Sequence, residues 1–396
     1  MKALEDDVIG RIDADEALDL LVALVNTPSA APEFPEEGCA RVVAEKLGES
    51  GVTATRCEVE PGRPNVLAEL GEPNGRSFLL SGHLDTVGAG DRSAWSSDPF
   101  SARIEDGRVF GRGASDDKGG VAAITLAFLA LQRAGGLPAG RLLLAAVMGE
   151  ETGNLGTRHL LSRAPRPDAA LVAEWTGAKD VAIGYRGVLW VEVKTTGRAA
   201  HGARPQEGVN AIDLMTERVL PAVKALPWSY EPNVLFQTPH PTVNVGRIEG
   251  GDRPNVVADS CSVLLDYRLV PGMSCEAASS LLRACLEDVG RGWEGAGVSS
   301  RILLKNEPFL LPESEPILGV LTRSIEDVTG ESPDWIGKTG FSDANVLVGE
   351  AGIPAVTFGP GNGSGHGPDE FVELDEVVTA AKVIALTALR FTRRET

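Results

Sequence analysis

The chain has 396 residues, of which 43% are hydrophobic and 23% are charged, and its formal net charge is −19. A chain of this length ordinarily folds into more than one domain, and we expect two. The composition is that of a soluble globular protein. Because its excess of carboxylates would repel phosphate groups, we expect neither a nucleic acid nor an anionic membrane as a partner.

The N-terminal segment is acidic and lacks a basic stretch followed by an apolar one, so it does not resemble a signal peptide. No apolar run reaches the length of about 18 residues that predicts a membrane span. The five cysteines are scattered and form no CxxC pair, which indicates reduced thiols. We therefore expect a cytoplasmic protein without a membrane segment.

The first half of the chain alternates between helical and strand patterns. Apolar residues at helical spacing predict helices over 14–25 and 36–50. The runs NVLAEL and SFLLSG predict strands, and an apolar helix is predicted over 121–135. Two further apolar runs, 141–151 and 169–175, contain acidic residues at or near their ends. This alternation predicts an α/β fold with a mainly parallel central sheet.

The pattern changes near residue 187, where VLWVEVKTTG alternates apolar and polar residues like a half-exposed antiparallel strand. Predicted helices over 209–224 and 276–289 and further strands complete an α+β block. After about residue 305, helix and strand alternate again. We predict one α/β domain formed by residues 1–187 and 305–396, interrupted by an inserted α+β domain at 188–304.

Acidic residues and histidines follow the predicted strands, where open α/β sheets bind their ligands. Taken singly, each of these acidic residues and histidines could have a purely structural role, since HxD triplets and paired glutamates are common on protein surfaces. Paired charges after a run apolar enough for a central strand would, however, be costly without partners. Imidazole and carboxylate groups together bind Zn, Mn or Co, and a shared carboxylate suits two ions. The combination predicts a metal site drawn from His83, Asp85, Asp116, Asp117, Glu150, Glu151, Glu174 and His366.

Five segments carry a family resemblance that covers nearly the whole chain. In order, they resemble the motifs of the dinuclear-zinc metallopeptidase family that includes aminoacylase, acetylornithine deacetylase, succinyl-diaminopimelate desuccinylase and glutamate carboxypeptidase. The resemblance implies a zinc-binding α/β domain with an inserted lid domain, which usually mediates dimerisation, so a homodimer is expected. The segments are SGHLDTV, GRGASDDKGG, GEETGNLGT, GRAAHGARP and GPGNGSGHGPDEFV.

By position, the resemblance implies two divalent metal ions, zinc in the first instance, with cobalt or manganese as alternatives. His83 and Glu174 match the ligands of one ion, Glu151 and His366 match those of the other, and Asp116 matches the bridging carboxylate. The family also implies a cis peptide bond after this bridging residue.

Three more residues are expected to assist these ligands. In a strand-like backbone Asp85 points the same way as His83 and could accept its ring N–H. Glu150 resembles the general base, which takes a proton from water and returns it to the leaving nitrogen. His201 matches a lid histidine that helps to bind the oxyanion in the partner subunit's active site; its alternative role is structural.

Substrate contacts are expected from two segments. Asn255 and Arg268 match lid positions that hold a substrate carboxylate, although Arg268 could instead pair with Asp266. The segment KTGFSDANV resembles a pocket-lining loop, with Thr339, Gly340 and Ser342 as candidate contacts, and its form is closer to the acetylornithine and acyl-lysine deacylases than to the desuccinylases. The two remaining histidines, His159 and His240, are expected to be non-catalytic.

The leading hypothesis is a metal-dependent amidohydrolase that cleaves a small N-acyl amino acid, like an acetylornithine or acyl-lysine deacylase. A glutamate carboxypeptidase-like or dipeptidase activity on a short peptide is the alternative within the class. The same scaffold could also act on a carrier-protein-linked amino acid. A catalytically silent binding or assembly protein is the alternative of another class, although such a relative would normally lack a ligand or the base, and the whole set is present here.

Overall fold

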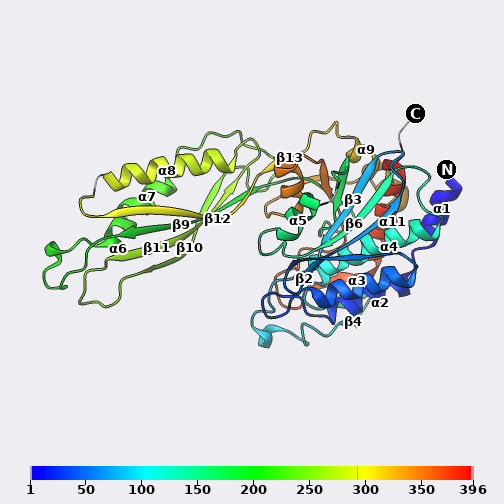
Figure 1. Ribbon diagram of the computed structural model, residues 1–396, viewed down its shortest axis with the longest axis horizontal. Helices are drawn as coiled ribbons and strands as arrows, with labels where there is room; N and C mark the ends of the chain where they lie inside the picture. Colours follow the sequence, from blue (N-terminus) through cyan, green and yellow to red (C-terminus); the bar gives the residue numbers. More distant parts are fainter. Residues whose placement is uncertain (1, 164, 292, 394–396) are drawn as a thin grey trace. The chain divides into compact units, whose positions relative to one another are not determined.

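The computed structural model describes residues 2–163, 165–291 and 293–393 (Figure 1). The chain divides into two compact units. Unit 1 comprises Met1–Ile183, Leu311–Ile336 and Ser342–Thr396, and unit 2 comprises Gly184–Leu310 and Gly337–Phe341. The inserted part thus begins and ends a few residues from the predicted range 188–304. The short segment Gly337–Phe341 also groups with unit 2, although the sequence pattern had placed it in the second part of the α/β domain.

Unit 1 is built on a mixed sheet whose central pairings are parallel. The pairings β6–β3, β3–β7 and β7–β15 are parallel, whereas β1–β2, β2–β6 and β15–β8 are antiparallel. The predicted α/β class is confirmed, with antiparallel strands added on both sides of the parallel centre. The strand order is β1 (Thr55–Glu60), β2 (Arg63–Gly71), β6 (Arg141–Val147), β3 (Ser77–His83), β7 (Ala169–Val172), β15 (Ala355–Thr357) and β8 (Val181–Tyr185), and β14 (Trp335–Lys338) also pairs with β8.

The core of unit 1 forms around α4 (Gly119–Arg133), whose residues are buried as far as Leu131. A helix that is apolar on all sides belongs in the centre of a domain. It packs against β3, β6 and the C-terminal helix α11 (Leu374–Phe391) (Figure 1). The other helical elements of unit 1 are α1 (Lys2–Gly10), α2 (Ala14–Val25), α3 (Glu37–Glu49), α5 (Leu155–Arg163), α9 (Pro316–Thr329), α10 (Asp343–Asn345), the short turn Arg92–Ala94 and the π-helical turns Ala114–Lys118 and Val346–Glu350.

A small antiparallel sheet in unit 1 joins the C-terminal part of the chain to residues 103–110. Its order is β16 (Phe371–Glu373), β5 (Arg108–Phe110) and β4 (Arg103–Glu105). Because β16 follows His366 and β5 precedes Asp116, this sheet brings two candidate ligand segments next to each other although they are far apart in sequence.

Unit 2 is a four-stranded antiparallel sheet with helices packed on one face. The strand β11 alternates buried and half-buried residues, as a sheet with one covered face requires. The buried face packs Val191, Val193, Val263 and Leu265 against Leu282 of α8. The order is β10 (Thr242–Gly250), β11 (Ser260–Leu269), β9 (Gly187–Thr196) and β12 (Gly297–Asn306), and the other elements are α6 (Ala211–Leu214), a π-helical turn Met215–Val219, α7 (Leu220–Lys224), α8 (Cys275–Arg291), a short turn Pro205–Glu207 and β13 (Phe309–Leu310).

Among the described residues, none of the helices combines the length and the apolar character that crossing a membrane would require.

Candidate metal centre

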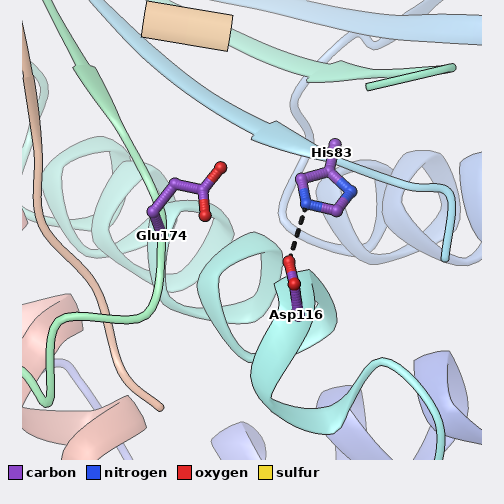
Figure 2. Close-up of side chains that lie close together, drawn as sticks. All are labelled: His83, Asp116 and Glu174. Atoms are coloured by element: carbon purple, nitrogen blue, oxygen red, sulfur yellow. Dashed lines mark hydrogen bonds and ion pairs between the residues drawn. The ribbon is translucent and has the colours of Figure 1, made fainter. Parts of the chain in front are cut away.

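The carboxyl ends of two neighbouring parallel strands and the turn before α4 bring three candidate ligands together in unit 1. His83 is the last residue of β3, Glu174 follows β7, and Asp116 lies in the turn Ala114–Lys118. One ligand atom from each of the three lies within 4.8 Å of the others. The Nε2 atom of His83 is 3.0 Å from Oδ1 of Asp116, and the Glu174 carboxylate faces the same space (Figure 2).

A second group of three shares Asp116 with the first. The Nε2 atom of His366 lies 3.0 Å from Oε1 of Glu151 and 3.3 Å from Oδ2 of Asp116. These ligand atoms also lie within 4.8 Å of one another. The two oxygens of Asp116 therefore face different imidazoles, Oδ1 toward His83 and Oδ2 toward His366. This is the arrangement that a carboxylate shared between two ions needs.

The charges at this centre show why cations fit there. His366, between two carboxylates, has its pKa raised to about 10 by its hydrogen bonds to Asp116 and Glu151. Burial opposes the charged form of His83, yet the nearby carboxylates of Asp116 and Asp85 raise its pKa. Burial and the neighbouring carboxylates raise the pKa of Glu150 well above its usual range. Imidazole nitrogens and carboxylate oxygens packed this closely match the ligand preference of Zn, Mn and Co, so the residues fit two divalent ions.

Asp85 organises the centre differently from the sequence expectation. The Nδ1 atom of His83 lies 2.9 Å from the backbone carbonyl oxygen of Asp85, whereas the nearest carboxylate oxygen of Asp85 is 3.6 Å away. The carboxylate instead accepts the backbone N–H groups of Glu150 and Glu151, each at 3.0 Å. The ring of His83 is thus oriented by a backbone carbonyl, and the Asp85 side chain holds the Glu150–Glu151 pair. Strand alternation placed Asp85 beside His83 but could not show which atom would be used.

Glu150 follows β6, which ends at Val147, and it is almost fully buried, with 5% of its surface exposed. The charges of His83, Glu151 and Glu174, which belong to both groups of candidate ligands, act on the pKa of Glu150. The peptide bond between Asp116 and Asp117 is cis, as the resemblance implied.

Sequence reasoning named Asp117 among the candidates without giving it a role, and it missed Glu370. The buried Asp117 carboxylate accepts the backbone N–H of His83 at 3.1 Å, which fixes the end of β3. The fully buried Glu370 carboxylate binds the backbone of the turn that presents Asp116. Its place directly before the apolar pair of β16 was the signal for Glu370, since a carboxylate that such a strand carries into the interior needs partners.

The candidate lid residues lie in unit 2. The exposed side chain of His201 accepts the backbone N–H of Ala203 through Nδ1 at 3.1 Å, and the backbone of Gly202 donates to Asn255 at 2.8 Å. A Cβ atom on Gly202 would lie 3.0 Å from the Asn255 backbone, so this close approach favours glycine. His201 and Asn255 are therefore held on adjacent segments of the same unit.

The other candidate substrate contacts differ in burial and in their present partners. The Arg268 guanidinium pairs with both carboxylate oxygens of Asp266 at 2.9–3.1 Å, which is the structural alternative that its sequence context left open. Ser342 is buried, and its side chain caps α10 by accepting the N–H of Ala344 at 3.2 Å. Thr339 and Gly340 are exposed in unit 2. Of the expected substrate contacts, Ser342 is thus a helix cap in this structure.

Comparison with known proteins identifies the family. The model of the peptidase family M20/M25/M40 matches residues 79–390, a range that contains every candidate metal ligand. The chain belongs to this family. The M20 chain is 30% identical over 389 residues to an acetylornithine deacetylase of Vibrio campbellii, covering 94% of this chain and 98% of the relative.

Solved structures share the fold. The aminopeptidase PepT from Bacillus cereus superposes with a TM-score of 0.77 at 22% identity, covering 97% of this chain and 100% of that one. The YXEP protein of Bacillus subtilis, described as a dinuclear metal binding peptidase of the M20 family, superposes with a TM-score of 0.70 at 16% identity, covering 96% and 98%. This M20 protein is an enzyme, a metal-dependent amidohydrolase, as its sequence predicted.

Proposed function

We propose that this enzyme removes the acyl group from a small N-acyl amino acid, with N-acetylornithine and related acylated basic amino acids as the first candidates. The observation that carries this proposal is the similarity to acetylornithine deacetylases along nearly the full length of both chains. The segment from Lys338 to Val346 supports it, because its sequence resembles this branch of the family.

The proposed metal ligands are the residues that the fold brings together. His83 and Glu174 would hold one ion, Glu151 and His366 the other, and Asp116 both. Zinc is proposed, with cobalt and manganese as alternatives, because the set combines imidazole and carboxylate ligands. Two such ions would lower the pKa of a water molecule and polarise the substrate carbonyl.

Glu150 is the proposed general base. Its carboxylate would take a proton from the attacking water and return it to the nitrogen of the leaving amino acid. A carboxyl group suits this task when its pKa is raised toward the working pH, and the burial of Glu150 acts in that direction. Asp85 would keep Glu150 in place through the backbone N–H of that residue.

The substrate side is assigned to unit 2 and the adjoining loop. His201 would help to bind the oxyanion, and Asn255, Arg268, Thr339, Gly340 and Ser342 are the proposed substrate contacts. To hold a substrate carboxylate, Arg268 would have to exchange its present partner, Asp266, or use its remaining N–H groups. Ser342 would keep its capping role and contribute through the position of its loop.

A cytoplasmic homodimer is the proposed state of the enzyme. Unit 2 supports it, because the edge strand β12 exposes two large apolar side chains, Ile302 at 41% and Leu303 at 43%. An exposed apolar edge strand is suited to pairing with another chain.

The test is a substrate panel assayed with the enzyme loaded with Zn, Co or Mn. It would compare N-acetylornithine, N-acetyl-lysine and N-acetylglutamate with dipeptides, C-terminal glutamyl peptides and a carrier-protein-linked acyl amino acid. Turnover highest on an acylated basic amino acid supports the proposal. A preference for the peptides would instead identify a carboxypeptidase or dipeptidase, and a lack of turnover on every compound with metal bound would overturn the proposal.

A further inference from the structure

Two loops of unit 1 that are far apart in sequence are bound together beside the metal centre. One is the turn from Gly111 to Asp116, and the other runs from Gly365 to Glu370. The backbone N–H of Gly111 donates to the carbonyl oxygen of Glu370 at 2.9 Å, and the Arg112 guanidinium donates to the carbonyl oxygen of Gly367 at 3.2 Å. Each loop carries one candidate ligand, Asp116 in the first and His366 in the second.

The Glu370 carboxylate is the centre of this connection. Its Oε1 atom accepts the backbone N–H groups of Ser115 at 2.9 Å and Asp116 at 3.0 Å. Its Oε2 atom accepts the N–H of Gly113 at 2.9 Å and a hydrogen bond from the Arg112 guanidinium. The side chain is fully buried, so all four of these donors are satisfied away from water.

Stability alone is a weak explanation for this arrangement. A buried ion pair such as Arg112–Glu370 can often be replaced by apolar residues with little loss of stability. An apolar residue could not, however, accept three backbone N–H groups of one turn. What the carboxylate specifically provides is a fixed backbone path through Gly113, Ser115 and Asp116.

The loop that carries Glu370 also contacts the side chain of Asp116. A Cβ atom on Gly365 would lie 3.0 Å from Cβ and 3.1 Å from Oδ2 of Asp116, so the loop passes directly against this side chain. The next residue, His366, places Nε2 at 3.3 Å from the same Oδ2 atom. One short loop therefore holds Asp116 both by its backbone N–H and by its carboxylate.

We propose that Glu370 is a positioning residue for the metal centre, which fixes Asp116 relative to His366 so that both can bind the same ion. The inference rests on the proposed function, in which Asp116 bridges two metal ions. Replacing the carboxylate by an amide puts an NH2 group opposite backbone N–H groups or opposite Arg112. The turn then loses acceptors, and the distance between Asp116 and His366 is no longer fixed.

The test compares Glu370→Gln with the matched control Glu373→Gln, which alters a partly exposed carboxylate three residues away that pairs with Arg108 at 2.7 Å. Metal-free proteins are titrated with Zn²⁺ by calorimetry and with Co²⁺ by visible absorption. We expect the wild type and Glu373→Gln to bind two ions, and Glu370→Gln to bind the ion of the Asp116–Glu151–His366 group about 10- to 100-fold more weakly. A shifted Co²⁺ spectrum is also expected.

The outcomes separate the two hypotheses. If the wild type does not bind two ions, the proposed function fails. If the wild type binds two ions and a folded Glu370→Gln protein binds them equally well, the positioning role fails, even if its thermal midpoint is lower. If Glu370→Gln does not fold, Glu370→Asp is tested in its place. This variant keeps the negative charge, but its side chain is one methylene shorter, so its oxygens lie farther from the backbone N–H groups of the turn. A folded Glu370→Asp protein with wild-type metal affinity would likewise overturn the inference, and weaker binding would support it.

Discussion

The carboxylate of Asp85 accepts the backbone N–H of Glu150 at 3.0 Å. The other oxygen of the same carboxylate accepts the next N–H, that of Glu151, and the backbone carbonyl of Asp85 receives the ring of His83. A single buried residue thus orients the proposed base and one proposed ligand of each ion. This relationship makes Asp85 a sensitive place to test the proposed mechanism.

Replacing Asp85 by Asn should damage both stability and activity. The amide has one acceptor oxygen, so its NH2 group must oppose one of the two backbone N–H groups. Leaving a buried donor unsatisfied costs about 1–3 kcal/mol. We expect a loss of that size in urea unfolding and a lower kcat on the best substrate of the panel. Asp91→Asn, at an exposed residue that caps a surface turn, is the control; equal effects of the two variants would contradict the prediction.

Replacing Glu150 by Gln should abolish most of the turnover while leaving metal binding intact. The amide cannot accept the proton of the attacking water, and general-base catalysis contributes about 10²- to 10⁴-fold in rate. We expect kcat to fall within that range with two ions still bound, as measured by elemental analysis. Glu350→Gln, which breaks a partly exposed ion pair with Arg158, serves as the matched control. An unchanged kcat in Glu150→Gln would remove this residue from its assigned role.

The pKa of His366 predicts a pH-dependent stability for the metal-free protein. Its hydrogen bonds to Asp116 and Glu151 raise the pKa from 6.5 to about 10. Because the folded pKa lies above the unfolded one, the stabilisation is fully present below pH 6.5 and is lost as the pH rises toward about 10. The thermal midpoint of metal-free wild type should therefore fall over this range more steeply than that of His366→Gln. Parallel profiles of the two proteins would refute the assignment.

Metal binding should release protons for the same reason. The imidazole of His366 must give up its proton before it can act as a ligand, so the affinity for Zn²⁺ should rise with pH between about 6.5 and 10. Titration calorimetry in buffers of different ionisation enthalpy measures the number of protons released. A release that is the same in wild type and His366→Gln would argue against this residue as the source.

The central helix offers a test of the fold without touching the site. Phe128 of α4 is fully buried, and truncating a buried aromatic ring to alanine typically costs about 3–5 kcal/mol. Phe128→Ala should therefore lower the free energy of unfolding by that amount. Ile104→Ala, at a residue that is 55% exposed, should change it far less. Urea unfolding of the two metal-free variants gives the comparison, and a loss at Phe128 below about 1 kcal/mol would be inconsistent with its burial.

Arg268 can be tested through its present partner. If its guanidinium binds the substrate carboxylate, Arg268→Lys should raise KM with a smaller effect on kcat, because an ammonium cannot form the two-pronged contact. Asp266→Asn weakens the ion pair seen in unit 2 and should leave KM unchanged or lower it. A wild-type KM for Arg268→Lys would mean that the pair with Asp266 is the residue's whole role.

The amino-acid sequence determined by itself several of the helices and strands and the chemical character of the site. Helical spacing of apolar residues predicted α2 over 14–25, and continuous apolar runs predicted β3 and β6. These elements could be predicted because the spacing of apolar residues along the chain shows which face of an element, or whether the whole element, is buried. The rule that ligands bind at the carboxyl ends of parallel strands then led to His83, Glu151 and Glu174 without any distance being known.

Only the tertiary structure decided which partner each side chain of the site contacts. It determined that the two oxygens of Asp116 face different histidines, that the Asp85 carboxylate binds backbone N–H groups, and that Arg268 pairs with Asp266. It also brought Glu370 against the Asp116 turn. Each of these contacts depends on the direction of a side chain or on the meeting of loops far apart in sequence. A local pattern of apolar and polar residues does not encode such directions, because they are set only when the whole sheet and its connections have packed.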